Sequence, residues 1–237
     1  MSSIRRLERV LNELGPARRS SRRRLRVSKG RRSLREAIGD IPDYIIDGSF
    51  VVPDGVTEIR DYAFDKCSRL TNITIPESVT KIGKWAFYRC SSLTSITIPE
   101  SVTEIGDMAF SGCTSLSSVI IPEGVAKIGS WAFSGCRNLK NITLPARVTK
   151  IGDGAFYRCS SLKNITIPES VTEIGSWAFS ECTGLSSVII PEGVAKIGNY
   201  AFYECTNLKK VSLPGRVKFG IGVFHDCHPD IELVYRD

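Results

Sequence analysis

The stretch CSSLTSITIPESVTEIGDMAFSG, residues 90–112, decides the fold of this chain. Ile96 and Ile98 alternate with small polar residues, which is the spacing of a β-strand with one buried face. Pro99 has no N–H to donate, so a strand ladder ends there. Gly106 permits a bend before the Ala-Phe pair, which we expect to lie in a short helical or 3₁₀ turn. Each such unit therefore offers one apolar edge and two open faces.

The same unit recurs along most of the 237 residues with a period of 23. One Cys marks each unit, and the last interval is 22 residues: Cys67, Cys90, Cys113, Cys136, Cys159, Cys182, Cys205 and Cys227. Two consecutive units, residues 91–136, match residues 160–205 at 18 of 23 positions in each unit, which indicates a longer duplication. Because one unit cannot bury its own apolar edge, the units must stack.

In-phase stacking places equivalent strands side by side, and connections between parallel strands are right-handed by default. The sequence therefore predicts an α/β fold. It is a right-handed solenoid with a parallel sheet on one face and short helical or 3₁₀ turns opposite.

The order of Leu, Ile, Pro, Gly, Ala-Phe and Cys resembles a known family. The pattern LxxIxIPxxVxxIGxxAFxxC, found from Leu93 to Cys113 and in six other units, resembles the BspA-type leucine-rich repeat. The resemblance covers roughly residues 48–235. It implies a curved leucine-rich-repeat solenoid whose strand-bearing face often binds protein partners, and a family whose members are frequently displayed on cell surfaces.

Charge and pattern divide the chain into three parts. Residues 1–36 carry 13 Lys and Arg but 3 acidic residues, a net charge of +10, while the remainder is −3. This basic arm contains a short amphipathic helical pattern that ends before Gly15-Pro16. We expect residues 37–53 to form an N-terminal cap hairpin turning at Asp47-Gly48. Residues 54–237 form the solenoid, which ends in a cap strand.

Two rows of side chains are candidate protein-binding surfaces. The outward strand positions are small and mostly polar, and they form either a solvated sheet or a flat docking surface: Asn72, Thr74, Ser95, Thr97, Ser118, Ile120, Asn141, Thr143, Asn164, Thr166, Ser187 and Ile189. The position before Ala-Phe forms a row that is either partly buried packing or an aromatic binding stripe. Its large members are Trp85, Trp131, Trp177 and Tyr200.

The Arg-rich part of the arm is a candidate site for an anionic partner. Arg side chains fit phosphate oxygens bidentately, and so many cations predict a steep salt dependence of binding. RNA or another polyanion, a nuclear or mitochondrial targeting role, and an acidic protein or anionic membrane all remain open. The residues concerned are Arg18, Arg19, Arg22, Arg23, Arg24, Arg26, Lys29, Arg31 and Arg32.

The sequence contains no recognisable set of catalytic residues. It has two His and no paired acid and base, no nucleophile beside a His and no phosphate-binding Gly loop. The string HDCH, His225 to His228, could supply metal ligands, but Cys227 keeps the phase of the core row. We therefore expect no enzyme activity, no cofactor, no metal and no small-molecule substrate.

The Cys row and the N-terminal composition bear on location. One Cys per unit is typical of a row of small buried thiols, and free thiols suit a reducing compartment. The first 30 residues contain no apolar block of signal-peptide type, and no run of 18 apolar residues exists. We expect an intracellular protein without a secretory leader, and a membrane partner is not favoured.

Two functional hypotheses follow. The first is a non-catalytic interaction scaffold whose solenoid binds protein while the arm tethers it to an anionic partner. The alternative is an RNA-binding or ribonucleoprotein component in which the arm contacts phosphate and the solenoid is peripheral.

Overall fold

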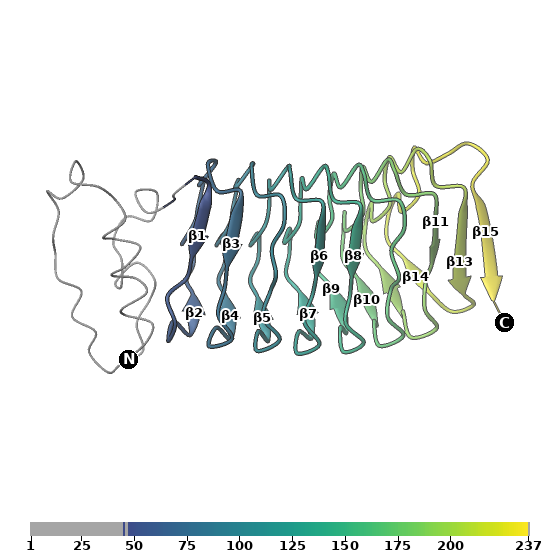
Figure 1. Ribbon diagram of the computed structural model, residues 1–237. Helices are drawn as coiled ribbons and strands as arrows, with labels where there is room; N and C mark the ends of the chain where they lie inside the picture. The colour runs from purple at the N-terminus through teal and green to yellow at the C-terminus, as the bar shows by residue number, and fades with distance from the viewer. Residues whose placement is uncertain (1–44, 46, 237) are drawn as a thin grey trace, which may run out of the picture.

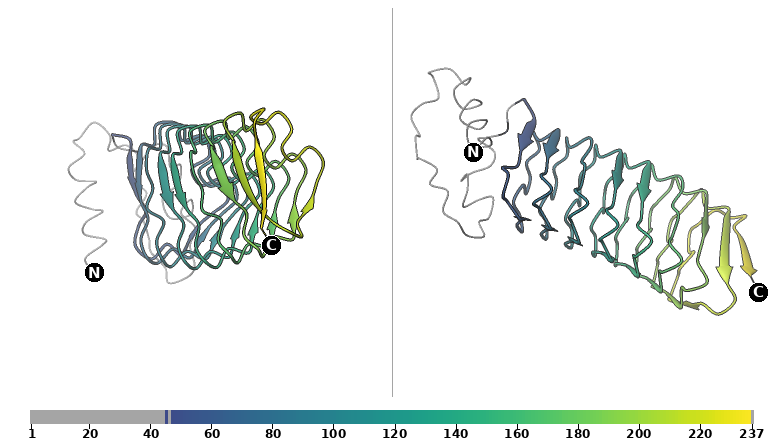
Figure 2. Two further views of the ribbon diagram at one scale, coloured as in Figure 1. Left: turned by 90° about the vertical axis from the view of Figure 1, so that its right-hand side faces the viewer. Right: turned by 60° about the horizontal axis from the view of Figure 1, so that its bottom comes forward.

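The chain forms an elongated stack of coils. The computed structural model describes residues 45 and 47–236, and in it each coil lies against the next in sequence order (Figure 1). Viewed close to the stack axis, successive coils lie behind one another (Figure 2). The predicted solenoid of stacked repeats is confirmed over these residues.

One side of the stack is a ladder of parallel strands, called here the front ladder. Neighbouring strands pair in exact 23-residue register, as Phe50 with Ile73 and Val119 with Ile142 show. Residues 95–97 join it through a single bridge from Ser95 to Ser118. The strands are β1 (Ser49–Val51), β3 (Asn72–Thr74), β6 (Ser118–Ile120), β8 (Asn141–Thr143), β11 (Ser187–Ile189), β13 (Lys210–Pro214) and β15 (Glu232–Arg236).

A second ladder of two-residue parallel strands forms another side. It follows each Pro after a turn, and its Ile side chains point inward while its Lys and Glu side chains point outward. The strands are β2 (Glu58–Ile59), β4 (Lys81–Ile82), β5 (Glu104–Ile105), β7 (Lys127–Ile128), β9 (Lys150–Ile151), β10 (Glu173–Ile174), β12 (Lys196–Ile197) and β14 (Lys218–Phe219).

The third side, here the turn side, corrects the prediction of helical or 3₁₀ turns. In the described residues it contains turns and no helix, so the α/β class is wrong and the fold is all-β there. The N–H groups of Trp85, Phe87 and Arg89 donate to carbonyls of the next coil, at 3.0, 2.7 and 2.7 Å. The N–H groups between them donate within their own turn, as Tyr88 does to Trp85 at 3.1 Å. A helix would need every N–H for its own ladder, so this alternation excludes one.

The interior is a continuous stack of aromatic rings beside the Cys row. The Phe rings from Phe64 to Phe202 are fully buried, and neighbouring rings lie nearly parallel with centroids 5.0–5.7 Å apart. The Gly after the second Ile allows this close spacing. A Cβ on Gly175 would lie 2.6 Å from the backbone nitrogen of Asp153 in the preceding coil.

The ends of the described stack extend the front ladder. Phe50 and Val52 are buried in phase with later strands, and β1 pairs in parallel with β3. A cap hairpin over 37–53 falls largely outside the described residues and stays a prediction. At the other end, β15 places Leu233 opposite Val211 and Tyr235 opposite Leu213, as the phase of IELVY predicted.

Candidate functional site

The predicted protein-binding residues form one exposed face, here the front face. The outward side chains of the front ladder lie side by side on neighbouring coils, about 4.8 Å apart. All twelve predicted residues are solvent exposed, and Lys140 and Lys163 add positive charge beside them. The structure therefore brings these residues together on one flat, mostly uncharged surface.

Three apolar side chains interrupt this polar face. Val51, Ile120 and Ile189 occupy the same outward position in their coils and are 63%, 69% and 62% exposed. They are three coils apart, which corresponds to about 14 Å between neighbours. Thr side chains fill the positions between them. The face thus carries a regular row of β-branched apolar residues, here the apolar row.

A row of carboxylates borders the front face and was not predicted from the sequence. The residue after each strand-ending Pro is acidic in most coils and exposed in every such case. This carboxylate rim consists of Asp54, Glu77, Glu100, Glu123, Glu169 and Glu192. In the described part of the chain, ion pairing reaches it at Glu192, whose Oε1 lies 3.1 Å from Arg236 Nη2. The recurring Pro-Glu dipeptide is the signal that could have identified this rim.

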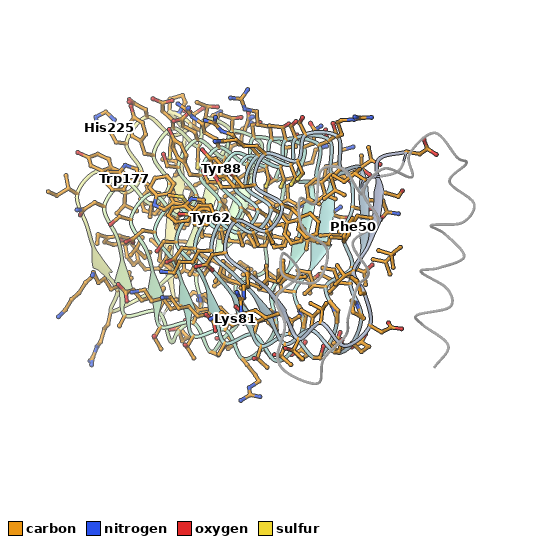
Figure 3. The ribbon with its side chains drawn as sticks, turned by 90° about the vertical axis from the view of Figure 1, so that its left-hand side faces the viewer. Phe50, Tyr62, Lys81, Tyr88, Trp177 and His225 are labelled. Atoms are coloured by element: carbon orange, nitrogen blue, oxygen red, sulfur yellow. The ribbon has the colours of Figure 1, made fainter. Side chains whose placement is uncertain are left out.

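The predicted aromatic stripe lies on the turn side as several interlocked stacks. Viewed along the axis, Tyr62, Tyr88 and Trp177 lie on this side, while Lys81 lies on the second ladder (Figure 3). The Tyr62 ring stacks on Trp85 with centroids 4.8 Å apart.

The other aromatic residues of this row pack in the same way. Trp177 stacks on Tyr200 at 5.9 Å, and the Trp131 ring covers Gly154, where a Cβ would lie 2.4 Å from Cε3. Trp177 is 41% exposed, while Trp85, Trp131 and Tyr200 are half-buried. Each ring face is largely occupied by a neighbour, so the row presents mainly ring edges to a partner.

These aromatic residues also adopt an unusual backbone conformation. Trp85, Trp131 and Trp177 have φ angles of 52°, 58° and 53°, in the left-handed region where bulky residues are rare. This conformation lets their N–H groups reach the next coil. Gly154 occupies the same position with φ 58°. The Gly in an otherwise aromatic row is the sequence signal of this conformation.

Charged side chains on the turn side and second ladder form local networks. Glu181 accepts hydrogen bonds from Tyr157 Oη at 2.6 Å and from Arg158 Nε at 2.7 Å, and these donors lower the pKa of its carboxyl against the raising effect of burial. On the second ladder, Glu173 lies 2.8 Å from Lys150 and 3.3 Å from Lys196. The alternating charges predicted there thus form inter-coil ion pairs, which fix register rather than bind a ligand.

The Cys row is a column of buried thiols. Cys67 to Cys205 are buried and unpaired, and Cys227 is half-buried. Each thiol from Cys90 onward donates to the carbonyl of a Phe in the preceding coil, at 3.0–3.2 Å. Burial raises the pKa of Cys136 and of Cys182 to about 12. These thiols therefore stay protonated and chemically inert.

The remaining predicted sites are placed as follows. Within the described ranges, no group of three or more His, Cys, Asp and Glu side chains is arranged to hold a metal ion. His225 lies on the turn side, with Nδ1 3.0 Å from Asp226 Oδ2. The Arg-rich site of residues 18–32 lies outside the described residues. Over the described part, no helix has both the length and the apolar character needed to span a membrane.

Comparison with known proteins identifies the repeat. The BspA type leucine rich repeat region matches residues 48–152 and 126–234, in six copies. Among solved structures, a leucine-rich repeat protein from Bacteroides ovatus is 34% identical with a TM-score of 0.65. The alignment covers 79% of this chain and 55% of that one, so this chain spans just over half the length of that relative. Among curated proteins, no significant match is found.

Two further bacterial structures are similar. A leucine-rich repeat protein from T. pallidum is 34% identical with a TM-score of 0.56, and the alignment covers 78% of both chains. A protein from Faecalibacterium prausnitzii, described as a leucine rich cell surface protein, is 31% identical with a TM-score of 0.54, covering 80% of this chain and 60% of that one.

These relatives contradict the predicted location. The expectation of an intracellular, reducing compartment, with nuclear or mitochondrial targeting as an option, is wrong, because the similar proteins are bacterial and one is described as a cell surface protein. The physical error lay in the Cys argument. Burial and hydrogen bonding protect the thiols from Cys67 to Cys205 in any compartment, so free Cys is no indicator of a reducing one.

Proposed function

The chain belongs to the BspA-type leucine-rich repeat family, and on that basis we propose that it is a non-catalytic binding protein whose front face docks a protein partner outside the cell. The proposal rests chiefly on the apolar row of Val51, Ile120 and Ile189. Three exposed apolar side chains at equal intervals on a flat face are unfavourable in water and would be stabilised by a partner.

The spacing of the apolar row favours a partner with an extended backbone. Four residues of an extended segment span about 14 Å, so a segment lying along the stack could place an apolar side chain on each row member. Helical same-face repeats of seven residues span about 10.5 Å and do not match. The carboxylate rim beside the face favours basic side chains in the same segment.

The experiment compares substitutions on the front face with a matched one elsewhere. The variant carrying Ile120→Lys and Ile189→Lys is expected to lose binding of a captured surface or matrix protein at least ~10-fold, about 1.4 kcal/mol. Ile221→Lys is the control, because Ile221 is 70% exposed but lies off the front ladder. Binding that survives the double substitution would contradict the front-face assignment, and loss with Trp177→Ala would favour the aromatic row instead.

The tether role of the basic arm is a separate part of the proposal. Its support is the charge of +10 over residues 1–36. Deleting residues 1–36 and treating the sample with nuclease separates the two hypotheses. A protein partner that persists through both treatments favours the scaffold, whereas partners lost in both favour the RNA-binding alternative. Substituting Arg22, Arg23 and Arg24 together should reduce the salt dependence of any polyanion binding.

A further inference from the structure

The last step of the Cys row differs from all the others. Cys205 and Cys227 are 22 residues apart instead of 23. Cys227 is half-buried, whereas Cys205 and the earlier thiols are buried. The row therefore has one member that solvent can reach, and its neighbour in the row is a second thiol.

The two thiols converge on one backbone group. Cys227 Sγ donates to the carbonyl oxygen of Phe202 at 3.0 Å, and the N–H of Cys205 donates to the same oxygen at 3.3 Å. Equivalent positions on neighbouring coils are about 4.8 Å apart, within the ~4.4–6.8 Å between Cα atoms that a disulfide allows. The pair needs no large backbone movement to be bridged.

The chemical environment of Cys227 also differs from that of the buried row. A hydrogen bond with the Cys205 thiol lowers the pKa of Cys227 below the ordinary value, against the raising effect of burial. Burial acts the other way at Cys136 and raises the pKa of its thiol to about 12. Since the thiolate is the reactive form, Cys227 is the member of the row prepared to react with an oxidant.

We propose that Cys205 and Cys227 are an oxidisable pair that a low-molecular-weight disulfide converts into an intramolecular disulfide, which fastens the last coil to the one before it. The Cys227 thiolate attacks one sulfur of the small disulfide and releases the first small thiolate, which takes the proton of Cys205. Cys205 then attacks the Cys227 sulfur of the mixed disulfide and releases the second small thiolate, which takes a proton from solvent. Two Cys thiols are oxidised and one small disulfide is reduced to two thiols.

The test exposes the full native chain to oxidised glutathione and counts free thiols after unfolding. The expected count falls from eight to six, peptide mapping finds Cys205 joined to Cys227, and the thermal midpoint rises until a reductant is added. Cys227→Ser is expected to keep its seven thiols throughout. Cys205→Ala is expected to stop at a glutathione adduct on Cys227, because no second thiol is there to resolve it.

Three outcomes would overturn the proposal. Retention of all eight thiols would mean that Cys227 does not react in the folded chain. A stable glutathione adduct on Cys227 of the wild-type chain would mean that Cys205 cannot reach it. A disulfide between other members, such as Cys159 and Cys182, would mean that access rather than the geometry of this pair governs oxidation.

Discussion

Ile197 and Phe219 occupy the same register position in neighbouring strands, β12 and β14, yet their environments differ. Ile197 is fully buried and Phe219 is 40% exposed. On the front ladder the same contrast separates Leu213, which is fully buried, from Tyr235, which is 56% exposed. The residues that follow the pattern are alike, so what differs is the presence of a further described coil. A coil buries its neighbour's side chains rather than its own.

The largest expected effect comes from removing a ring inside the stack. Phe133→Ala deletes a fully buried ring between Phe110 and Phe156 and should cost about 3–5 kcal/mol. Phe219→Ala in the last coil should cost about 1 kcal/mol, because that ring is already partly in water. Urea unfolding of the two variants measures the difference. Equal losses would mean that burial by the neighbouring coil is not what stabilises the interior.

A smaller effect is expected from widening the space between coils. Gly175→Ala places a Cβ 2.6 Å from backbone and side-chain atoms of Asp153, and overpacking of this kind costs about 1–3 kcal/mol. Gly215→Ala in the last coil meets one atom, the Arg236 carbonyl oxygen at 3.2 Å, and should cost less than about 1 kcal/mol. Thermal unfolding compares them. A Gly175 variant as stable as the Gly215 variant would contradict the close-contact explanation.

The smallest expected effect concerns ion pairs and depends on pH. Hydrogen bonds from Lys150 and Lys196 lower the pKa of Glu173 in the folded chain, against the raising effect of burial. Its contribution is therefore complete above the unfolded pKa of ~4.3 and is lost as the pH falls through the lower folded pKa. Glu173→Gln should cost on the order of 0.5 kcal/mol at pH 7, and the difference from wild type should disappear in acid.

The last coil supplies the control for this ion-pair prediction. Glu232 lies 3.7 Å from Lys210, and both side chains are about 60% exposed. Glu232→Gln should therefore leave the free energy of unfolding unchanged at pH 7. A similar loss for both variants would mean that general surface charge, and not the pairing at Glu173, accounts for the effect.

The repeat made the interior predictable from sequence. The 23-residue phase placed Phe133 and Cys136 inside, set the register of the ladders and put Leu233 opposite Val211. The turn side was predicted incorrectly as helical, because an apolar pair three residues before a Cys is compatible with a helix or with successive turns. The backbone of Trp85 in the left-handed region distinguishes them, and a propensity argument gives no reason to expect it there.

The surface was only partly predictable. Alternation along each strand identified the outward residues such as Thr97, but exposure of Ile120 and Ile189 as an evenly spaced row needed the stack itself. The carboxylate rim was overlooked because each Pro-Glu, such as Pro99-Glu100, resembles ordinary surface polarity when one unit is considered at a time. Only alignment of the coils in space turns single residues into a continuous charged edge.

The constant register between coils has a consequence for how such a protein can change. Removing residues 137–159, one complete period, would leave the contacts of the flanking coils equivalent and bring Ile189 nearer to Ile120 by one strand spacing, about 4.8 Å. Insertions of the same length would separate them by the same step. Duplication and loss of units thus act as a ruler, resizing the distance between recognition points in whole increments while the architecture stays intact.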